Sequence, residues 1–258
     1  MCHAQTPTGP QPRARTREVE IPLRGGERMP AVLSSPADDV GAAAPPVLVI
    51  PDMFGRSPFY ERLAGRLAEA GFAALLVDYF FRLDPLAELS HEAGFERRRQ
   101  LDESRSIEDL RASIAWLRAE HGCGARVGTI GFCMGGTFAL DLTALEPGLA
   151  TVAFYGFPVP QATLASPPAA PLHLAQQLRG PILALWGARD EVVGKENVAT
   201  FVARMEEAEE VEFEHRVYPG LGHGFLAAAD DPDASEETCA AVTDAWHATL
   251  AHLGRQLG

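Results

Sequence analysis

Residues 126–140 have the sequence RVGTIGFCMGGTFAL, in which a β-branched run, a cysteine between glycines and an apolar run follow one another. Residues 127–130 favour a strand, and residues 137–140 favour a helix. Glycines two positions before and after Cys133 leave room for the close backbone contacts of an abrupt strand-to-helix turn. This spacing predicts a nucleophile elbow that lifts the thiol above a sheet and directs the Met134 N–H at a substrate oxyanion. The alternative is a tight turn around a buried cysteine, since free cysteine is among the most buried residue types.

The size and composition of the chain fit one globular domain. It has 258 residues, of which 47% are hydrophobic and 22% are charged, as is normal for a single α/β domain. The longest apolar run, residues 70–77, is too short to span a bilayer. The net charge of −13 disfavours nucleic acid and anionic membranes as partners, because both would be repelled. Residues 1–16 are expected to form a disordered tail, and residues 17–258 to form the domain.

The N-terminal residues and the cysteines suggest a cellular location. Arginines at positions 13, 15 and 17 are not followed by an apolar segment, so no secretory signal is predicted and a cytoplasmic location is expected. The four cysteines include no Cys-x-x-Cys pair, which argues against a zinc site or a redox motif. Disulfides are not expected in a chain of this size without an export signal.

Apolar periodicity divides the chain into alternating strands and helices. Residues 19–23 and 29–33 flank a Gly25-Gly26 turn and predict an antiparallel hairpin. Buried or edge strands are then expected at residues 47–50, 72–77, 127–130, 151–155, 181–186 and 211–218, with helices between them. This alternation predicts an α/β fold with a doubly wound, mostly parallel sheet. The charged segment 83–100, with arginines at 97–99, either caps the site or forms a solvated helix face.

A thiol nucleophile needs a base for its proton and a carboxylate that orients the base. Asp190 follows the predicted strand at 181–186, and His223 is the only histidine set between glycines after a strand. The chain order Cys133, Asp190, His223 is the order of nucleophile, acid and histidine in the α/β-hydrolase arrangement. Glu191 is a rival for the acid, and an aspartate after a strand is also a common helix cap.

Four segments together resemble the dienelactone hydrolase family of α/β-hydrolases: IPDMFG (50–55), GFCMGG (131–136), GARD (187–190) and GLGHGF (220–225). The resemblance extends from about Val19 to the C-terminus. Its cysteine elbow is the specific part, because most α/β-hydrolases have serine there. The resemblance implies that Cys133 is the nucleophile, His223 the base and Asp190 its orienting acid, in hydrolysis of lactone or ester bonds without a cofactor or metal. It also implies that the Met53 N–H is the second oxyanion donor.

The chain departs from the family pattern at two places. Family members have a glutamate at the position of Asp52, which is thought to hold the resting thiol until substrate arrives; aspartate is one methylene shorter, and a turn role after Pro51 is the alternative. Dienelactone hydrolases proper have an arginine shortly after the histidine that binds a substrate carboxylate, whereas residues 224–229 are GFLAAA here. Arg82 matches an arginine of the family and is the remaining candidate for this contact, with a surface salt bridge as the alternative.

The sequence therefore predicts a dienelactone hydrolase-like enzyme that forms a thioester at Cys133 and acts on a small lactone or ester. A broad carboxylesterase or thioesterase is the nearest rival. A noncatalytic thiol sensor on the same fold is the rival from another class. A sensor needs neither His223 nor Asp190, so the presence of both favours an enzyme. The oligomeric state is not indicated by the sequence.

Overall fold

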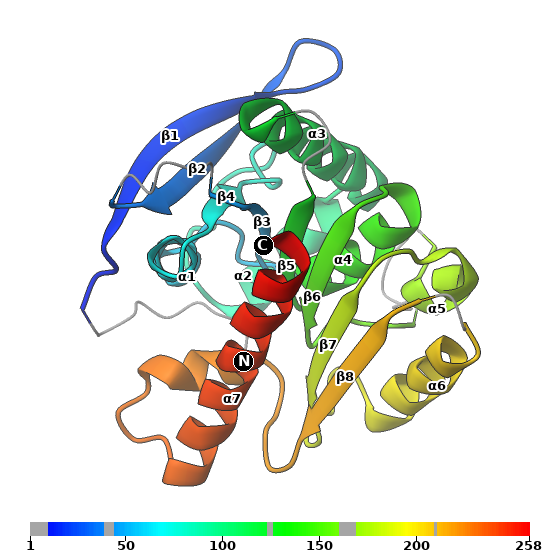
Figure 1. The fold of residues 1–258 in the computed structure, drawn as a ribbon. Coiled ribbons are helices and arrows are strands. Elements are labelled where there is room, and N and C mark those ends of the chain that lie inside the picture. The colour runs from blue at the N-terminus through cyan, green and yellow to red at the C-terminus, as the bar shows by residue number, and fades with distance from the viewer. Residues whose placement is uncertain (1–9, 39–43, 123–125, 160–168, 209–210) are drawn as a thin grey trace.

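The computed structural model describes residues 10–38, 44–122, 126–159, 169–208 and 211–258, and eight strands within them form one sheet (Figure 1). The strand order is β1-β2-β4-β3-β5-β6-β7-β8. The strands are β1 (Ala14–Pro22), β2 (Arg28–Pro36), β3 (Pro46–Ile50), β4 (Ala73–Val77), β5 (Val127–Phe132), β6 (Leu149–Phe154), β7 (Ile182–Gly187) and β8 (Phe213–Tyr218). Strands β3 to β8 pair in parallel, whereas β1 and β2 join the sheet antiparallel. The predicted mostly parallel sheet with an N-terminal hairpin is confirmed.

The hairpin starts earlier than expected. Strand β1 begins at Ala14, which pairs with Pro36, so three residues that we assigned to a disordered tail belong to the strand. Most side chains at the start of β1 are exposed, and a strand exposed on both faces has no apolar alternation to reveal it. Residues 1–9, which make up most of the expected tail, lie outside the described residues. The organisation as one domain stays a prediction.

Helices cover both faces of the sheet, as two positions on β5 show. A Cβ at Gly128 would touch Leu253 and Leu257, while a Cβ at Gly131 would touch Ala139. Residues an odd number apart on a strand point to opposite faces, so the last and the fourth helix cover opposite faces of β5. The helices are α1 (Pro58–Glu69), α2 (His91–Gln100), α3 (Glu103–His121), α4 (Met134–Leu145), α5 (Pro171–Leu174), α6 (Lys195–Glu206) and α7 (Glu236–Leu257), with the 3-10 helices η1 (Ala175–Gln177) and η2 (Phe225–Asp230).

The centre of the sheet is apolar on both faces. Every residue of β3 to β7 is buried, as is expected for parallel strands covered by helices on both sides. Strand β8 is one edge of the sheet, opposite β1, and most of its side chains are exposed. Among the described residues, no helix combines the length and the apolar character needed to cross a membrane.

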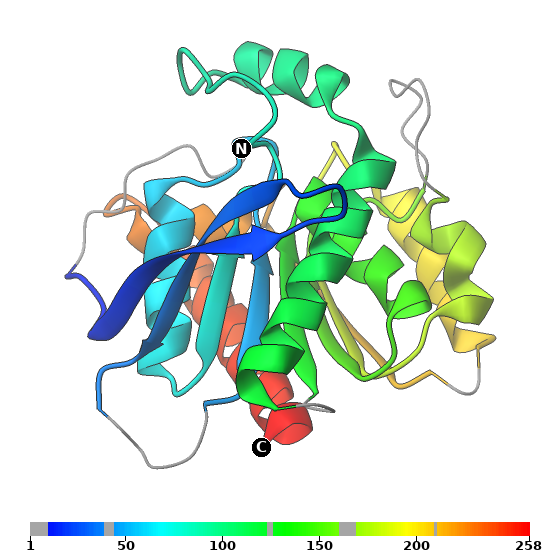
Figure 2. The same cartoon turned by 90° about the horizontal axis from the view of Figure 1, so that it is seen from above.

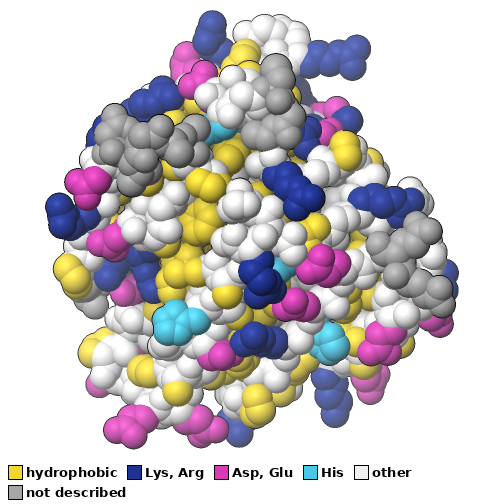
Figure 3. Space-filling model, viewed as in Figure 1, with side chains coloured by type: hydrophobic (Ala, Val, Ile, Leu, Met, Phe, Trp, Pro, Cys, Tyr) yellow, Lys and Arg dark blue, Asp and Glu magenta, His cyan; other side chains and the backbone are white. Residues whose placement is uncertain are grey.

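The charged segment between β4 and α3 forms helix α2, which stands apart from the layers of the fold (Figure 2). Its only buried residues are Gly94 and Arg98. The solvated-face interpretation therefore holds for most of α2, yet two of its three successive arginines turn toward the body of the protein. Basic and acidic side chains are interspersed over the face seen in Figure 3, and the described residues there form no extended basic patch.

The elbow requires glycine at position 131, and we predict that Gly131→Ala prevents stable folding. A Cβ there would lie 2.1 Å from the Gly135 carbonyl oxygen, so the variant is expected to lose at least ~3 kcal/mol of unfolding free energy or to be insoluble. Gly254→Ala is the control, because a Cβ on α7 at that position meets nothing within 4 Å. This variant is expected to gain about 0.5–1 kcal/mol of unfolding free energy, since alanine favours the helix more than glycine does. Urea unfolding measures both; equal stability of the two variants would contradict the packing.

Candidate active site

Cys133 lies at the junction between β5 and α4, in the geometry that the glycine spacing predicts. Its φ is 56°, a conformation that costs energy for a residue with a side chain and is retained where packing enforces it. The enforcing contact is close, because a Cβ at Gly135 would lie 2.3 Å from the carbonyl oxygens of both Ile50 and Pro51. Helix α4 thus starts directly against the end of β3. Cys133 is buried at 4% exposure, next to the first N–H groups of a helix.

His223 and Asp190 form a buried pair. The Nδ1 of His223 donates to Oδ2 of Asp190 over 2.8 Å, and both side chains are almost inaccessible. The other oxygen of Asp190 accepts the N–H groups of Val192 and Val193 at 3.0 and 2.9 Å, which fixes the carboxylate. The rival acid, Glu191, is exposed. The structure therefore brings Asp190, and not its neighbour, to the histidine.

The imidazole of His223 also contacts Cys133, so the three predicted residues meet in space. Burial lowers the pKa of His223. Hydrogen bonds with Asp190 and Cys133, together with their charges, outweigh this effect and raise the pKa to about 9. The rings of Tyr155 and Phe157 flank the imidazole, with centroids 5.1 and 5.7 Å from it. These contacts favour the protonated form of the imidazole.

The segment after β3 runs beside the elbow. Ile50 pairs with Gly131 across the parallel strands, so Asp52 and Cys133, each two residues further on, leave the sheet side by side. The carboxylate Oδ1 of Asp52 accepts the Phe54 N–H at 2.9 Å, which is the turn role considered for this residue. Asp52 is fully buried, so the structure combines a turn contact with a place next to the thiol.

Two N–H groups near the thiol suit a developing negative charge. The Met53 N–H makes no hydrogen bond to any described residue. Met134 is the first residue of α4, where an N–H has no acceptor within the helix and the helix dipole favours an anion. Because β3 and β5 are adjacent, the Met53 segment runs beside the elbow, and the role of the two N–H groups as oxyanion donors stays a prediction.

The dienelactone hydrolase family model matches residues 29–257. The chain belongs to the dienelactone hydrolase family. It is accordingly a hydrolase with the α/β-hydrolase fold, in which the hairpin and the mostly parallel sheet are the expected elements.

Relatives of known name match most of the chain. Carboxymethylenebutenolidase of Rhodococcus opacus is 32% identical over 257 residues, covering 100% of this chain and 98% of that protein. Carboxymethylenebutenolidase 2 of Cupriavidus pinatubonensis is 32% identical over 197 residues, covering 76% and 80%. A candidate dienelactone hydrolase of Klebsiella pneumoniae has a solved structure with a TM-score of 0.81 and 28% identity, covering 94% of this chain and 99% of that one.

Arg82 lies in an ion-pair network rather than at the thiol. Its guanidinium donates to both carboxylate oxygens of Glu27, in the loop between β1 and β2, and of Asp109, on α3. These hydrogen bonds raise its pKa, and Arg105 also pairs with Glu27. The salt-bridge alternative is the one that the structure shows. The charge of Arg82 is thus compensated by these carboxylates, and its contact with a substrate carboxylate stays a prediction.

Two arginines of α2, both from the run at 97–99, turn toward the body of the protein. Arg97 donates to the Met53 carbonyl oxygen at 3.1 Å. Arg98 is buried and pairs with Glu103 at 3.4 Å, and its guanidinium lies 5.9 Å from the ring centre of Phe157. The run of three arginines was visible in the sequence, but the mostly polar α2 has no apolar stripe to indicate which of them face inward.

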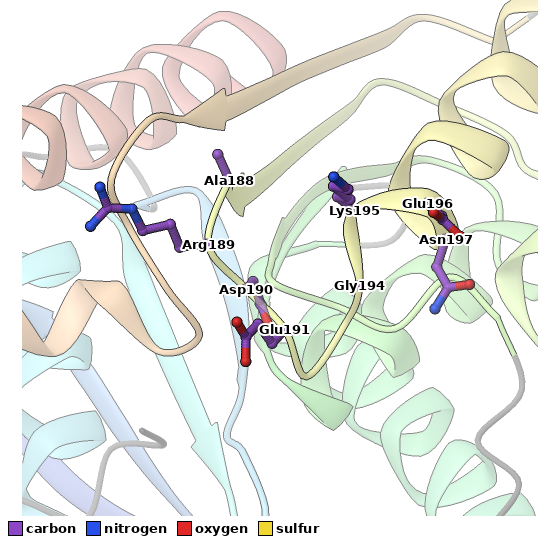
Figure 4. A pocket seen from close by; sticks show the side chains of 8 residues that line it. All are labelled: Ala188, Arg189, Asp190, Glu191, Gly194, Lys195, Glu196 and Asn197. Atoms are coloured by element: carbon purple, nitrogen blue, oxygen red, sulfur yellow. The ribbon is translucent and has the colours of Figure 1, made fainter.

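A pocket of about 560 Å³ adjoins the loop that follows β7 (Figure 4). Its wall includes Asp190 and Glu191 on one side and the start of α6, with Lys195, on the other. Acidic and basic groups are mixed in this wall, so it has no clear preference for a ligand charge. No group of three or more His, Cys, Asp or Glu side chains among the described residues is arranged to hold a metal ion.

The pair with Asp190 makes the titration of His223 a test of the geometry. We expect the His223 pKa near 9 in the wild type and well below that in Asp190→Asn, because burial then lowers it with less opposition. NMR titration of the imidazole measures both values. Since the folded pKa exceeds the ordinary 6.5, the pair stabilises the fold fully below pH 6.5, and this contribution is lost as the pH rises through about 9.

The control is Glu191→Gln, because Glu191 is the exposed neighbour of Asp190. Its His223 titration should match that of the wild type. An unchanged midpoint in Asp190→Asn, or an equal shift in both variants, would show that Asp190 does not hold the imidazole.

Proposed function

We propose that this hydrolase cleaves lactones or small esters through Cys133, His223 and Asp190, with a thioester acyl-enzyme. The supporting observation is that His223 contacts the Asp190 carboxylate at 2.8 Å and also makes a side-chain contact with Cys133. The names of the two carboxymethylenebutenolidase relatives agree with lactones as substrates. No cofactor is needed for this chemistry.

Acylation begins with a thiolate, the nucleophilic form of cysteine. With a His223 pKa of about 9, the imidazole is basic enough to take the thiol proton when substrate arrives. The sulfur attacks the carbonyl carbon, and the oxyanion accepts the N–H groups of Met53 and Met134. As the tetrahedral intermediate collapses, the C–O bond breaks and His223 gives its proton to the leaving oxygen. In a lactone that oxygen stays attached to the acyl group.

Deacylation repeats these steps with water. His223, now neutral, takes a proton from water as the oxygen attacks the thioester carbonyl. The same two N–H groups hold the second oxyanion. Its collapse breaks the C–S bond, releases a carboxylic acid and restores the thiolate beside the protonated imidazole. Asp190 keeps the ring oriented throughout.

Two finer expectations belong to this proposal. Asp52, buried beside the thiol, would disfavour the thiolate by like charge until substrate arrives, which is the role of the family glutamate. A cytoplasmic location agrees with the state of the two described cysteines, Cys133 and Cys239, which are both free thiols.

A broader esterase activity on neutral substrates is the second candidate, and one observation favours it. A substrate carboxylate buried in the site needs a paired cation, but Arg82 is held by Glu27 and Asp109. No arginine follows His223 in residues 224–229. We therefore propose a weaker preference for carboxylated lactones than in dienelactone hydrolases proper.

We predict that Cys133→Ala lowers kcat/KM for a p-nitrophenyl ester by at least ~10³-fold, because the variant lacks the attacking atom. Cys239→Ala is the matched control, since Cys239 is an exposed thiol on α7, and it should retain wild-type turnover. Comparable turnover in Cys133→Ala would refute the proposed mechanism, and absence of turnover in the wild type would favour the thiol sensor.

For substrate charge, we expect appreciable kcat/KM for a small neutral ester beside a matched carboxylate-bearing lactone. The ratio of the two values should stay within about twofold in Arg82→Ala, because Arg82 contributes to stability rather than to substrate binding. A strong carboxylate preference that disappears in Arg82→Ala would show that Arg82 binds the substrate carboxylate.

A further inference from the structure

The segment Pro51–Gly55 is held by a hydrogen bond at nearly every peptide group. The Pro51 carbonyl accepts the Tyr79 hydroxyl at 2.6 Å, and the Asp52 N–H donates to the Tyr60 hydroxyl at 3.3 Å. The Asp52 carbonyl accepts the Gly55 N–H at 2.9 Å. Among the N–H groups of Asp52, Met53 and Phe54, only that of Met53 makes no hydrogen bond to a described residue. The surrounding bonds thus determine the direction of this one N–H.

The peptide group that joins Met53 to Phe54 is fixed at both ends by charged side chains. Its N–H donates to the Asp52 carboxylate at 2.9 Å, and its carbonyl oxygen accepts Nη2 of Arg97 at 3.1 Å. Hydrogen bonds to charged groups are stronger than neutral ones. The Met53 N–H belongs to the preceding peptide group, and the two groups meet at the Met53 Cα, so fixing the Met53–Phe54 peptide limits the backbone torsions next to that N–H.

The Arg97 side chain is itself confined. Its guanidinium lies 4.3 Å from the ring centre of Phe80. A Cβ at Gly55 would lie 3.2 Å from Nη2 of Arg97 and 3.2 Å from Cδ2 of Phe80, so the turn packs closely against both the guanidinium and the ring. One helical turn earlier on α2, a Cβ at Gly94 would lie 3.3 Å from three atoms of the Met53 side chain. Helix α2 therefore contacts Met53 both at its carbonyl and at its side chain.

We propose that helix α2 is the positioning element of the oxyanion site, with Arg97 as the positioning residue that sets the direction of the Met53 N–H. This inference rests on the proposed function. Arg97 touches neither the sulfur nor the substrate in this scheme and acts through the Met53 peptide alone. Helix α2 stands apart from the layers of the fold (Figure 2) and contacts Met53 through one arginine and one glycine. Packing of α2 against Met53 therefore completes the oxyanion site.

The test compares Arg97→Met with Arg99→Met. Arg99 lies two positions further on the same helix, is exposed and pairs with Glu96. In Arg97→Met we expect kcat for a p-nitrophenyl ester to fall about 10- to 100-fold, because a misdirected oxyanion donor weakens transition-state binding. KM should change less than about threefold. Arg99→Met should match the wild type in both constants.

Two further measurements separate a positioning role from a general disturbance. Iodoacetamide alkylation of Cys133 needs the thiolate but forms no oxyanion, so its rate should stay within about twofold of the wild type in Arg97→Met. A small aldehyde inhibitor adds its carbonyl carbon to the sulfur, and its oxygen takes the oxyanion position. Its inhibition constant should therefore rise by the same factor by which kcat falls. Arg97→Lys, which keeps a donor on a flexible chain, should recover part of both losses.

The outcomes are distinct. An unchanged kcat in Arg97→Met, or an alkylation rate that falls as far as kcat, would overturn the inference while Cys133→Ala still shows that the thiol is required. If Arg97→Met does not fold, Arg97→Lys decides by the same two ratios. Turnover that survives in Cys133→Ala would overturn the proposed function, and the inference with it.

Discussion

The close contact between the first turn of α4 and the ends of β3 and β5 is the constraint on which the site depends. At Gly131 and Gly135 the backbones approach so closely that no Cβ fits. The helix can then begin only directly above the strands, and the chain reaches it through Cys133 with a φ of 56°. The same contact presses α4 against the Pro51 carbonyl, which brings the Met53 segment alongside. Backbone packing therefore places the thiol and the Met134 N–H and brings the Met53 segment beside them, and the hydrogen bonds of that segment then orient the Met53 N–H.

Burial and hydrogen bonding act in opposite directions on the pKa of His223. Burial alone would favour a neutral ring, yet the contacts with Asp190 and Cys133 outweigh it and raise the pKa. The protein can keep such a buried ion pair because Asp190 is also held by two N–H groups of its own loop. An imidazole flanked by aromatic rings and fixed by a rigid carboxylate is suited to moving one proton between sulfur, water and a leaving oxygen.

The features that the sequence predicts are those encoded locally. The glycines around Cys133, the hairpin turn and the apolar strands each leave a pattern within a few residues, and chain order alone places Asp190 and His223 after neighbouring strands. The partner of Arg82 could not be predicted, because Glu27 lies 55 positions away and no local pattern links the two. The inward direction of Arg97 depends on where α2 docks. The positive φ of Tyr155 could not be predicted either, because a positive φ is expected at glycine. The start of β1 was missed because its exposed end lacks alternation.

The network around Arg82 has a consequence for how the fold responds to its solvent. It joins the loop between β1 and β2 to α3 through Glu27, Asp109 and Arg105, whereas β3 to β7 are held by buried apolar side chains. Charge pairs near the surface are screened within about 8 Å at physiological ionic strength, but apolar packing is not weakened in this way. Concentrated salt therefore weakens the link between the hairpin loop and α3, whereas the pairing of β2 with β4 and the apolar packing of β3 to β7 stay in place.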